Sequence, residues 1–273
     1  MIDKEAFFIS LFDKKYIGDD GAVIGDKVYS KDLFCENIHF KRSWMSLEQI
    51  AYKSMLINIS DAIVMNAKPQ FALLGIKIPS DFTTKQMNEL YFGFERASKE
   101  FDFEIIGGDT VAGSTLDISI TIISETKNPT KRDDLKMGDF VAYTGELGSV
   151  KKDLDALLNN QEISQNSKFI TPKLKADFFY EVAPFINAAL DISDGLSKDL
   201  SRLSKINGVG FEFFRNFSKD ILCSGEEYEI LFTFEPKNLD MIEKIAKKHD
   251  TDITVFAKVT EGTYTSQCKE NHF

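Results

Sequence analysis

The chain has 273 residues, of which 43% are hydrophobic and 28% charged, and its formal net charge is −10. This length suits two domains or one large α/β domain, and no apolar run reaches the ~20 residues that span a bilayer. The acidic balance argues against a phosphate-backbone binder, so we expect neither nucleic acid nor membrane as partner, whereas small anionic ligands remain compatible if divalent cations stand between them and the carboxylates.

The N-terminal half predicts alternating strands and helices. Residues 46–67 indicate a helix, because Ser46 and Gln49 have the spacing of a capping box and the apolar residues recur on one broad face. The other predicted elements are two short strands within 22–34, a strand at 71–79, a helix at 83–101, a strand at 103–110 that breaks at its two glycines, and a strand at 116–124.

A polar segment at 127–139, which contains Pro129, marks the best domain boundary. We therefore divide the chain into residues 1–133 and 134–273. The second part predicts strands at 139–145, 188–193, 208–214, 227–234 and 252–259, and helices at 150–159, 173–188, 194–205 and 237–249. Both parts alternate strand and helix, which indicates an α/β or α+β fold. Neither carries a Rossmann fingerprint or a Walker loop.

The three cysteines, Cys35, Cys223 and Cys268, show no close pairing and no metal-ligand spacing. An odd, scattered set of cysteines is typical of a reducing compartment. The N-terminal "AFFISLF" is short and lacks a small-residue cleavage site, so it does not resemble a signal peptide. These observations predict a cytoplasmic protein.

Several aspartates occupy strand ends or glycine-rich turns. Asp61 differs, since it lies inside an otherwise apolar helix three residues after Asn58. A buried carboxylate needs a cation, a donor set or a metal. Asp109 follows two glycines that permit a close backbone approach to a ligand. Asp194 has an alternative interpretation as a helix N-cap.

The adjacent pair Asp19 and Asp20 raises the same question of repulsion. Strand-like alternation sends the two side chains in different directions. Mg²⁺ prefers oxygen ligands and bridges carboxylates to substrate phosphates. Carboxylates gathered from distant parts of the chain therefore suggest phosphoryl transfer or metal-assisted hydrolysis.

Six segments, in this order, are similar to motifs of the thiamine-monophosphate kinase family: "YIGDDGAVI", "NISDAIVMNAKP", "IIGGDT", "GDFVAYTGELG", "LDISDGLSKDL" and "SGEEYEILFT". They span residues 16–235. This family belongs to a superfamily with aminoimidazole ribonucleotide synthetase, selenophosphate synthetase and the hydrogenase maturation factor HypE. The resemblance implies a two-domain, PurM-like α/β protomer and a homodimer whose N-terminal domains join their sheets into a barrel. It also implies transfer of the γ-phosphoryl group of ATP to thiamine monophosphate with several Mg²⁺ ions.

The resemblance also assigns roles to residues at the motif positions. Its metal ligands are Asp20, Ser30, Lys31, Asp32, Asp61, Asp109, Asp191 and Asp194. Its nucleotide contacts are Gly108, Asp109, Arg132 and Ser193, and its contacts to thiamine phosphate are His39 and Glu226. Of these, Asp109, Arg132 and Asp194 are the expected catalytic group. From the residues alone, His39 is a strand-edge histidine bonded to the backbone; the resemblance favours a substrate contact.

The sequence departs from the family pattern at a few positions. Lys31 replaces a small hydroxyl residue, so a ligand there is its backbone carbonyl. Glu227 replaces an aspartate, and the segment between Asp194 and Glu226 is shorter than usual. The family's C-terminal aromatic residue falls on Glu270, with Phe273 just beyond.

Two alternatives remain open. One is another superfamily enzyme that uses ATP on a different acceptor; HypE usually ends in a cysteine, whereas Cys268 lies five residues from the end. Selenophosphate synthetase requires an N-terminal cysteine or selenocysteine, and no cysteine precedes Cys35. The other alternative is a nucleotide-binding regulatory protein without turnover.

Overall fold

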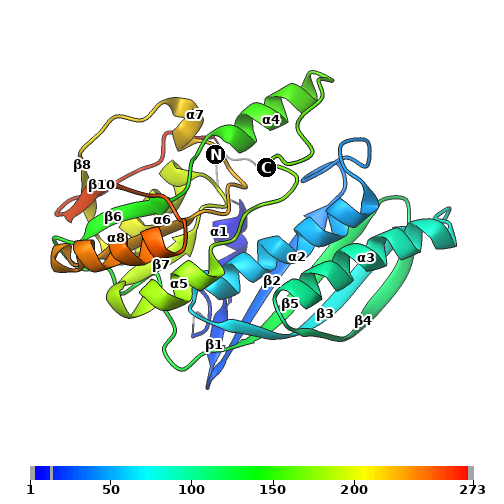
Figure 1. The fold of residues 1–273 in the computed structure, drawn as a ribbon, viewed down its shortest axis with the longest axis horizontal. Helices are drawn as coiled ribbons and strands as arrows, with labels where there is room; N and C mark the ends of the chain where they lie inside the picture. Colours follow the sequence, from blue (N-terminus) through cyan, green and yellow to red (C-terminus); the bar gives the residue numbers. More distant parts are fainter. Residues whose placement is uncertain (1–3, 13–14, 270–273) are drawn as a thin grey trace.

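The computed structural model describes residues 4–12 and 15–269. Two five-stranded sheets organise this part of the chain, one on either side of the polar segment 127–139. We refer to β1 through β5 with their helices as the N-terminal unit, and to β6 through β10 with theirs as the C-terminal unit (Figure 1). This arrangement is the predicted mixed α/β fold. The exact division at residue 133 stays a prediction.

The first sheet has the order β1-β2-β5-β3-β4, antiparallel except for the parallel pair of β3 and β4. Its strands are β1 (Ala22–Ile24), β2 (Lys27–Cys35), β3 (Lys68–Pro79), β4 (Glu104–Gly113) and β5 (Asp117–Glu125). Helices α2 (Leu47–Val64) and α3 (Thr84–Glu100) cover one face of it (Figure 1). The sheet is open within one chain, so the barrel expected for a dimer is not closed by the described residues.

The second sheet is antiparallel throughout and has the order β7-β9-β6-β10-β8. Its strands are β6 (Phe140–Thr144), β7 (Ala188–Asp191), β8 (Gly210–Phe213), β9 (Ile230–Phe234) and β10 (Ile253–Thr260). Its helices are α4 (Ser149–Leu158), α5 (Ala176–Val182), α6 (Leu196–Asn207), α7 (Lys219–Leu222) and α8 (Leu239–Lys248), with short 3₁₀ turns at Ala183–Phe185 and Pro236–Asn238. Helix α1 (Lys4–Ile9), like α7, was not predicted.

Helix α2 joins the two units, because it is buried on nearly all sides. Its predicted capping box is present: the Ser46 hydroxyl accepts from the Gln49 backbone, and the Gln49 side chain accepts from the Ser46 backbone. One continuous apolar core includes α2, the inner face of the first sheet, and residues of α5, α8 and β9. A helix that is apolar all round belongs in the middle of a protein. Polar residues on α2 are therefore buried between the units.

Alternation along the strands separates the two faces of each sheet. In β9, Phe232 contacts the core shared with α2, whereas its neighbour Leu231 packs into a second core against Leu200 of α6. In β2, Ser30 and Phe34 face α2 and are buried, while Leu33 is exposed on the other face. Successive strand residues point to opposite faces, so this alternation decides which side chains reach the space between the units.

The prediction that the strand at 103–110 breaks at its glycines was wrong. β4 runs through Gly107 and Gly108 and pairs with β3 beyond them. Both glycines have positive φ, and a Cβ atom on Gly108 would lie 1.7 Å from the Leu74 carbonyl oxygen. Only glycine tolerates such a conformation and contact, so the close approach that these glycines permit within the chain is that of strand β3.

The helix predicted at 173–188 is shorter, because it begins at Ala176 and gives way to a 3₁₀ turn at Ala183–Phe185. Proline lacks the amide hydrogen that an α-helix needs, and Pro184 stands where the α-helix ends.

The cysteine prediction was also wrong. Cys223 and Cys268 form a disulfide across 45 residues of sequence, and Cys35 is free. Spacing along the chain could not show that the fold brings the segment after α7 next to the C-terminal segment. The cysteines therefore no longer support a reducing compartment. In the described part of the chain, no helix is both long and apolar enough to cross a membrane.

Candidate active site

A cavity of about 660 Å³ lies where the two units meet, and we call it the acidic cavity. Loops before β1, strand β2, helix α2, the end of β7 and helix α6 all contribute side chains to it. Its charged lining residues are Asp19, Asp20, Lys31, Asp32, His39, Asp61, Arg132, Asp191, Asp194, Arg202, Lys205 and Glu226. Most of the predicted site residues thus come together here.

Three carboxylates form the centre of this cavity. Oxygen atoms of Asp20, Asp61 and Asp191 lie within 4.8 Å of one another, although the residues come from the loop before β1, from α2 and from the end of β7. Asp191 is only 2% exposed and accepts a hydrogen bond of 2.7 Å from the Ser60 hydroxyl. Three clustered oxygen donors match the ligand preference of Mg²⁺.

Burial and mutual repulsion perturb this group strongly. The pKa of Asp191 is raised to about 7, first by burial and then by the charge of Asp20. The same two causes raise the pKa of Asp32 to about 6. The pKa of Asp61 is raised well above its usual value by burial and by the charge of Asp32. A cation placed among these groups would remove the repulsion and restore their ionised forms.

Arg132 is the positive group closest to the cluster. Its Nε donates to Asp20 Oδ2 at 3.0 Å, and its Nη2 donates to Asp20 Oδ1. Burial opposes the charged form, but the charge of Asp20 outweighs it and raises the Arg132 pKa. Such a two-pronged contact fixes the plane of the guanidinium.

Asp19 has a different role from its neighbour, as the sequence predicted. One carboxylate oxygen of Asp19 accepts from the Asp20 amide, and the other accepts from the Arg132 amide at 3.4 Å. It therefore stabilises the turn and the segment that carries Arg132, while Asp20 points to the other carboxylates.

Asp194 and Ser193 line the opposite wall, on the loop between β7 and α6. Asp194 accepts a 2.7 Å bond from Arg202, whose other nitrogen donates to Asp199 at 2.9 Å. Glycine 195 occupies the N-cap of α6 and makes no side-chain cap, so the alternative in which Asp194 caps this helix is not what the structure shows.

His39 satisfies both interpretations of its sequence. Its Nδ1 accepts from the Cys35 amide at 2.9 Å, and its ring stacks on Phe34 while it also lines the cavity. Since Nδ1 is an acceptor, a neutral His39 ring carries its proton on Nε2. The backbone contact thus orients the ring without removing it from the site.

Glu226 enters the cavity from the loop between α7 and β9, and the family departure at Glu227 has a simple explanation. Glu227 points away from the cavity, where its carboxylate accepts from the Gly148 amide at 2.6 Å and pairs with Lys168 at 3.0 Å. The change from aspartate to glutamate therefore lies behind the site wall.

Four predicted residues are not part of the acid cluster. Ser30 is buried and donates to Asn58 Oδ1 at 2.6 Å. Lys31 reaches Ser119 on the outer face of the sheet, although it also touches the cavity rim. Gly108 and Asp109 lie on the exposed strand β4 and do not line the acidic cavity. Their assigned roles stay predictions, and Glu270 and Phe273 fall outside the described residues.

Sequence reasoning missed several residues that the structure brings to the site. Lys53 and Ser60 lie on α2, Arg202 lies on α6, and Tyr228 follows Glu226 in the cavity wall. A lysine inside an apolar helix was an available signal for Lys53, because a buried ammonium requires a partner. Arg202 lies eight residues after Asp194, which places both on one side of the helix start.

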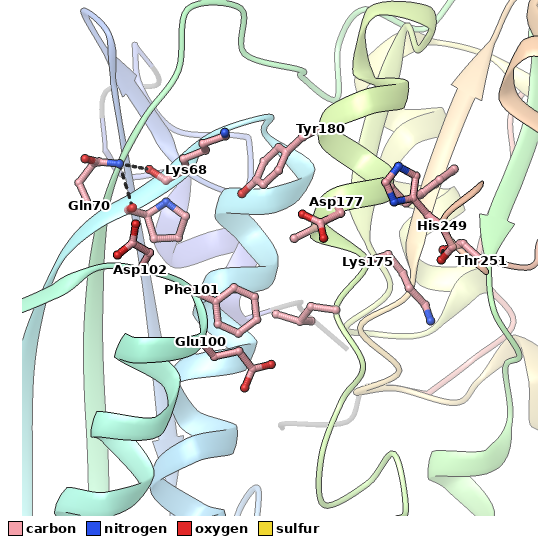
Figure 2. A pocket seen from close by; sticks show the side chains of 14 residues that line it. Lys68, Gln70, Glu100, Phe101, Asp102, Lys175, Asp177, Tyr180, His249 and Thr251 are labelled. Carbon is pink, nitrogen blue, oxygen red and sulfur yellow. Dashed lines mark hydrogen bonds between the residues drawn. The ribbon is translucent and has the colours of Figure 1, made fainter. Parts of the chain in front are cut away.

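A second cavity, of about 620 Å³, opens between the units elsewhere. Figure 2 shows its charged side chains spread over both walls, with Glu100 and Asp102 on one side and Lys175, Asp177 and His249 on the other. Tyr180 donates to the Ala67 carbonyl at 2.9 Å and so links the units near this cavity. Among the described residues, only the acidic cavity contains three acids close enough to share a metal.

Comparison with known proteins agrees with this geometry. The family model for the N-terminal domain of AIR synthase related proteins matches residues 18–126. The thiamine-monophosphate kinase of Buchnera aphidicola subsp. Schizaphis graminum is 30% identical over 279 aligned residues, which cover 91% of this chain and 85% of that protein. The Aquifex aeolicus enzyme of the same name is 28% identical and covers 85% of this chain and 86% of its own length.

A solved structure, AaThiL complexed with AMPPCP and TMP, has a TM-score of 0.84 and 27% identity to the present chain, with coverage of 97% and 94%. Six ordered motifs, a shared fold over nearly the whole length, and relatives of one activity agree with one another. The chain belongs to the thiamine-monophosphate kinase family.

Proposed function

We propose that this protein transfers the γ-phosphoryl group of ATP to thiamine monophosphate in a Mg²⁺-dependent reaction that gives ADP and thiamine diphosphate. The observation that carries the proposal is the Asp20, Asp61 and Asp191 cluster, buried in the acidic cavity of a chain of this family. The bond between the γ-phosphorus and its bridging oxygen breaks, and a phosphate oxygen of the acceptor forms the new bond.

The acceptor chemistry explains why the site is rich in carboxylates and needs no strong base. A phosphate monoester is already ionised near neutral pH, so no proton has to be removed from the attacking oxygen. The difficulty lies in bringing two polyanions together in line. Bound Mg²⁺ would neutralise phosphate charge there, and the fit rests on oxygen donors alone: Asp20, Asp61 and Asp191, with Asp32 adjoining.

The remaining residues have roles that follow from position. Arg132 and Arg202 present guanidinium groups to the cavity, where they can donate to phosphate oxygens. Ser193 and Asp194 occupy the wall beside them, and His39 and Glu226 are our proposed contacts to the acceptor.

We extend the proposal to a homodimer formed through the outer face of the first sheet. Tyr29, Leu33, Phe71 and Leu73 are each between 38% and 58% exposed on this face, which no helix of the chain covers. In the strand register, Asp109 shares a row with Gly75, Ser119 and Leu33, so it belongs to the same face. A second copy docked there would bring Asp109 near another chain, whereas it is remote from the acid cluster of its own.

Two measurements test these proposals. Purified protein with ATP, Mg²⁺ and thiamine monophosphate should form thiamine diphosphate, which chromatography detects. Protein that binds ATP but forms no product would support the regulatory alternative instead. Light scattering should give the mass of two chains for the wild type and of one for Leu33→Glu; a wild-type monomer would refute the dimer. A cytoplasmic location stays a prediction.

A further inference from the structure

Lys53 is a fully buried lysine that no motif singled out. It lies on α2, its side chain is 0% exposed, and its Nζ lies 4.3 Å from the centre of the Phe169 ring and 5.5 Å from that of Phe34. Burying an ammonium group among aromatic rings is costly unless a carboxylate compensates it. The compensating group is Glu226, whose Oε2 accepts from Lys53 at 2.6 Å.

Glu226 belongs to the other unit and faces the acidic cavity. It is 173 residues away from Lys53 in sequence, and its side chain is 21% exposed. The ion pair therefore joins α2 of the N-terminal unit to the loop before β9. On α2, Ile57 and Asp61 follow Lys53 at intervals of four and also line the cavity, so one helix face carries the pair and a member of the acid cluster.

The backbone around Glu226 is fixed by its neighbours. Glu226 and Tyr228 both have positive φ and line the cavity, whereas Glu227 and Glu229 point away from it and pair with Lys168 at 3.0 and 2.8 Å. The Glu226 amide donates to the Ser193 carbonyl at 2.7 Å. With the main chain pinned, the freedom that remains is the rotation of the Glu226 side chain, and Lys53 removes it.

We propose that Lys53 is a positioning residue for the acceptor phosphate ester: it holds the Glu226 carboxylate, in one rotamer and ionised, at the end of the cavity away from the nucleotide. This inference rests on the proposed function, because it takes Glu226 to contact thiamine monophosphate. The acceptor carries a thiazolium cation, and a carboxylate held in place would meet it without an ordering cost. Lys53 itself lies behind Glu226 and acts only through it.

The test compares Lys53→Met, Glu226→Gln and the double variant with the wild type. The measurements are kcat, KM for thiamine monophosphate at saturating ATP, KM for ATP, and the urea midpoint of unfolding. Each single variant should raise KM for thiamine monophosphate about tenfold, with KM for ATP within about twofold. Since Lys53 acts through Glu226, the double variant should match Glu226→Gln. It should also regain stability over both single variants, because it leaves no buried charge unpaired.

Tyr180→Phe is the matched control. It removes another hydrogen bond between the units, that to Ala67 beside the second cavity, and should lower the urea midpoint without changing either KM. If Lys53→Met does not fold, the comparison of Glu226→Gln with the double variant still decides the question, since equal KM values are required.

The inference is overturned if Lys53→Met raises both KM values equally, raises neither, or has the same effect in the presence and absence of Glu226. If the wild type forms no thiamine diphosphate, the proposed function fails, and calorimetric titration of thiamine monophosphate into the same proteins judges Lys53 by the dissociation constant. A wild type that neither phosphorylates nor binds this ester overturns both.

Discussion

The two cavities between the units have nearly equal volumes, about 660 and 620 Å³, but their charges are arranged differently. In the acidic cavity, carboxylates from distant segments crowd together at its centre, next to one bidentate arginine. In the second cavity, acids and bases alternate along the walls (Figure 2). Volume alone therefore does not mark a site. What distinguishes the acidic cavity is like charge buried at a free-energy cost that a metal and phosphates can offset.

The largest expected difference between the cavities comes from matched aspartate-to-asparagine changes. Asp61→Asn should lower kcat/KM by roughly 10³-fold or more, since a metal ion contributes several kcal/mol to phosphoryl transfer. Asp177→Asn, in the wall of the second cavity, should change it less than about twofold. Without metal, Asp61→Asn should also be more stable to urea than the wild type, because it removes a repelled, buried carboxylate. Equal activities of the two variants would abolish the distinction.

A somewhat smaller effect is expected at the arginine. Arg132→Gln keeps a hydrogen-bond donor but loses the charge and the fork, so kcat should fall by about 10²-fold. The fold should persist, as circular dichroism would show. Rescue of the rate by added guanidinium ion would support a direct role on the phosphates, whereas an unchanged kcat would place Arg132 outside the chemistry.

The smallest effect, a few kcal/mol, concerns stability against pH. The pKa values of Asp191 and Asp32 are raised to about 7 and about 6 in the folded protein, from a model value of 3.8. The folded state therefore binds more protons than the unfolded state in this window, and its contribution to stability is present at low pH and lost as pH rises through these values. One pKa unit corresponds to about 1.4 kcal/mol.

Urea unfolding of metal-free protein at about pH 5 and about pH 8 checks this sign. These aspartates should make the protein less stable at the higher pH, and Mg²⁺ should restore stability there more than at the lower pH. A wild type whose pH dependence equals that of Asp61→Asn would show that the cluster does not titrate as the burial requires.

Much of the fold could be predicted because the signals were local. The capping box at Ser46 and the apolar face of α2 needed only neighbouring residues. The burial of Asp61 also followed from its helix, which is why a partner or metal could be expected. Its actual neighbours, Asp20 and Asp191, came from the family motifs rather than from periodicity.

The features that escaped prediction depend on long-range pairing. The partner of Lys53 lies on a loop 173 residues away, and the disulfide partners lie 45 apart. The continuity of β4 through Gly108 depends on a register shift against β3. A one-residue difference in register reverses the faces of a strand, and no local pattern specifies it. The outward position of Asp109 has the same origin.

The most direct measurement is calorimetric titration of Mg²⁺ into the wild type and Asp61→Asn, each with a non-hydrolysable ATP analogue, in buffers of different ionisation enthalpy. The account predicts that the wild type binds Mg²⁺ and releases protons, because the metal ionises carboxylates with raised pKa values. It predicts that Asp61→Asn loses most of this binding. Tight Mg²⁺ binding by Asp61→Asn with the same proton release would contradict it.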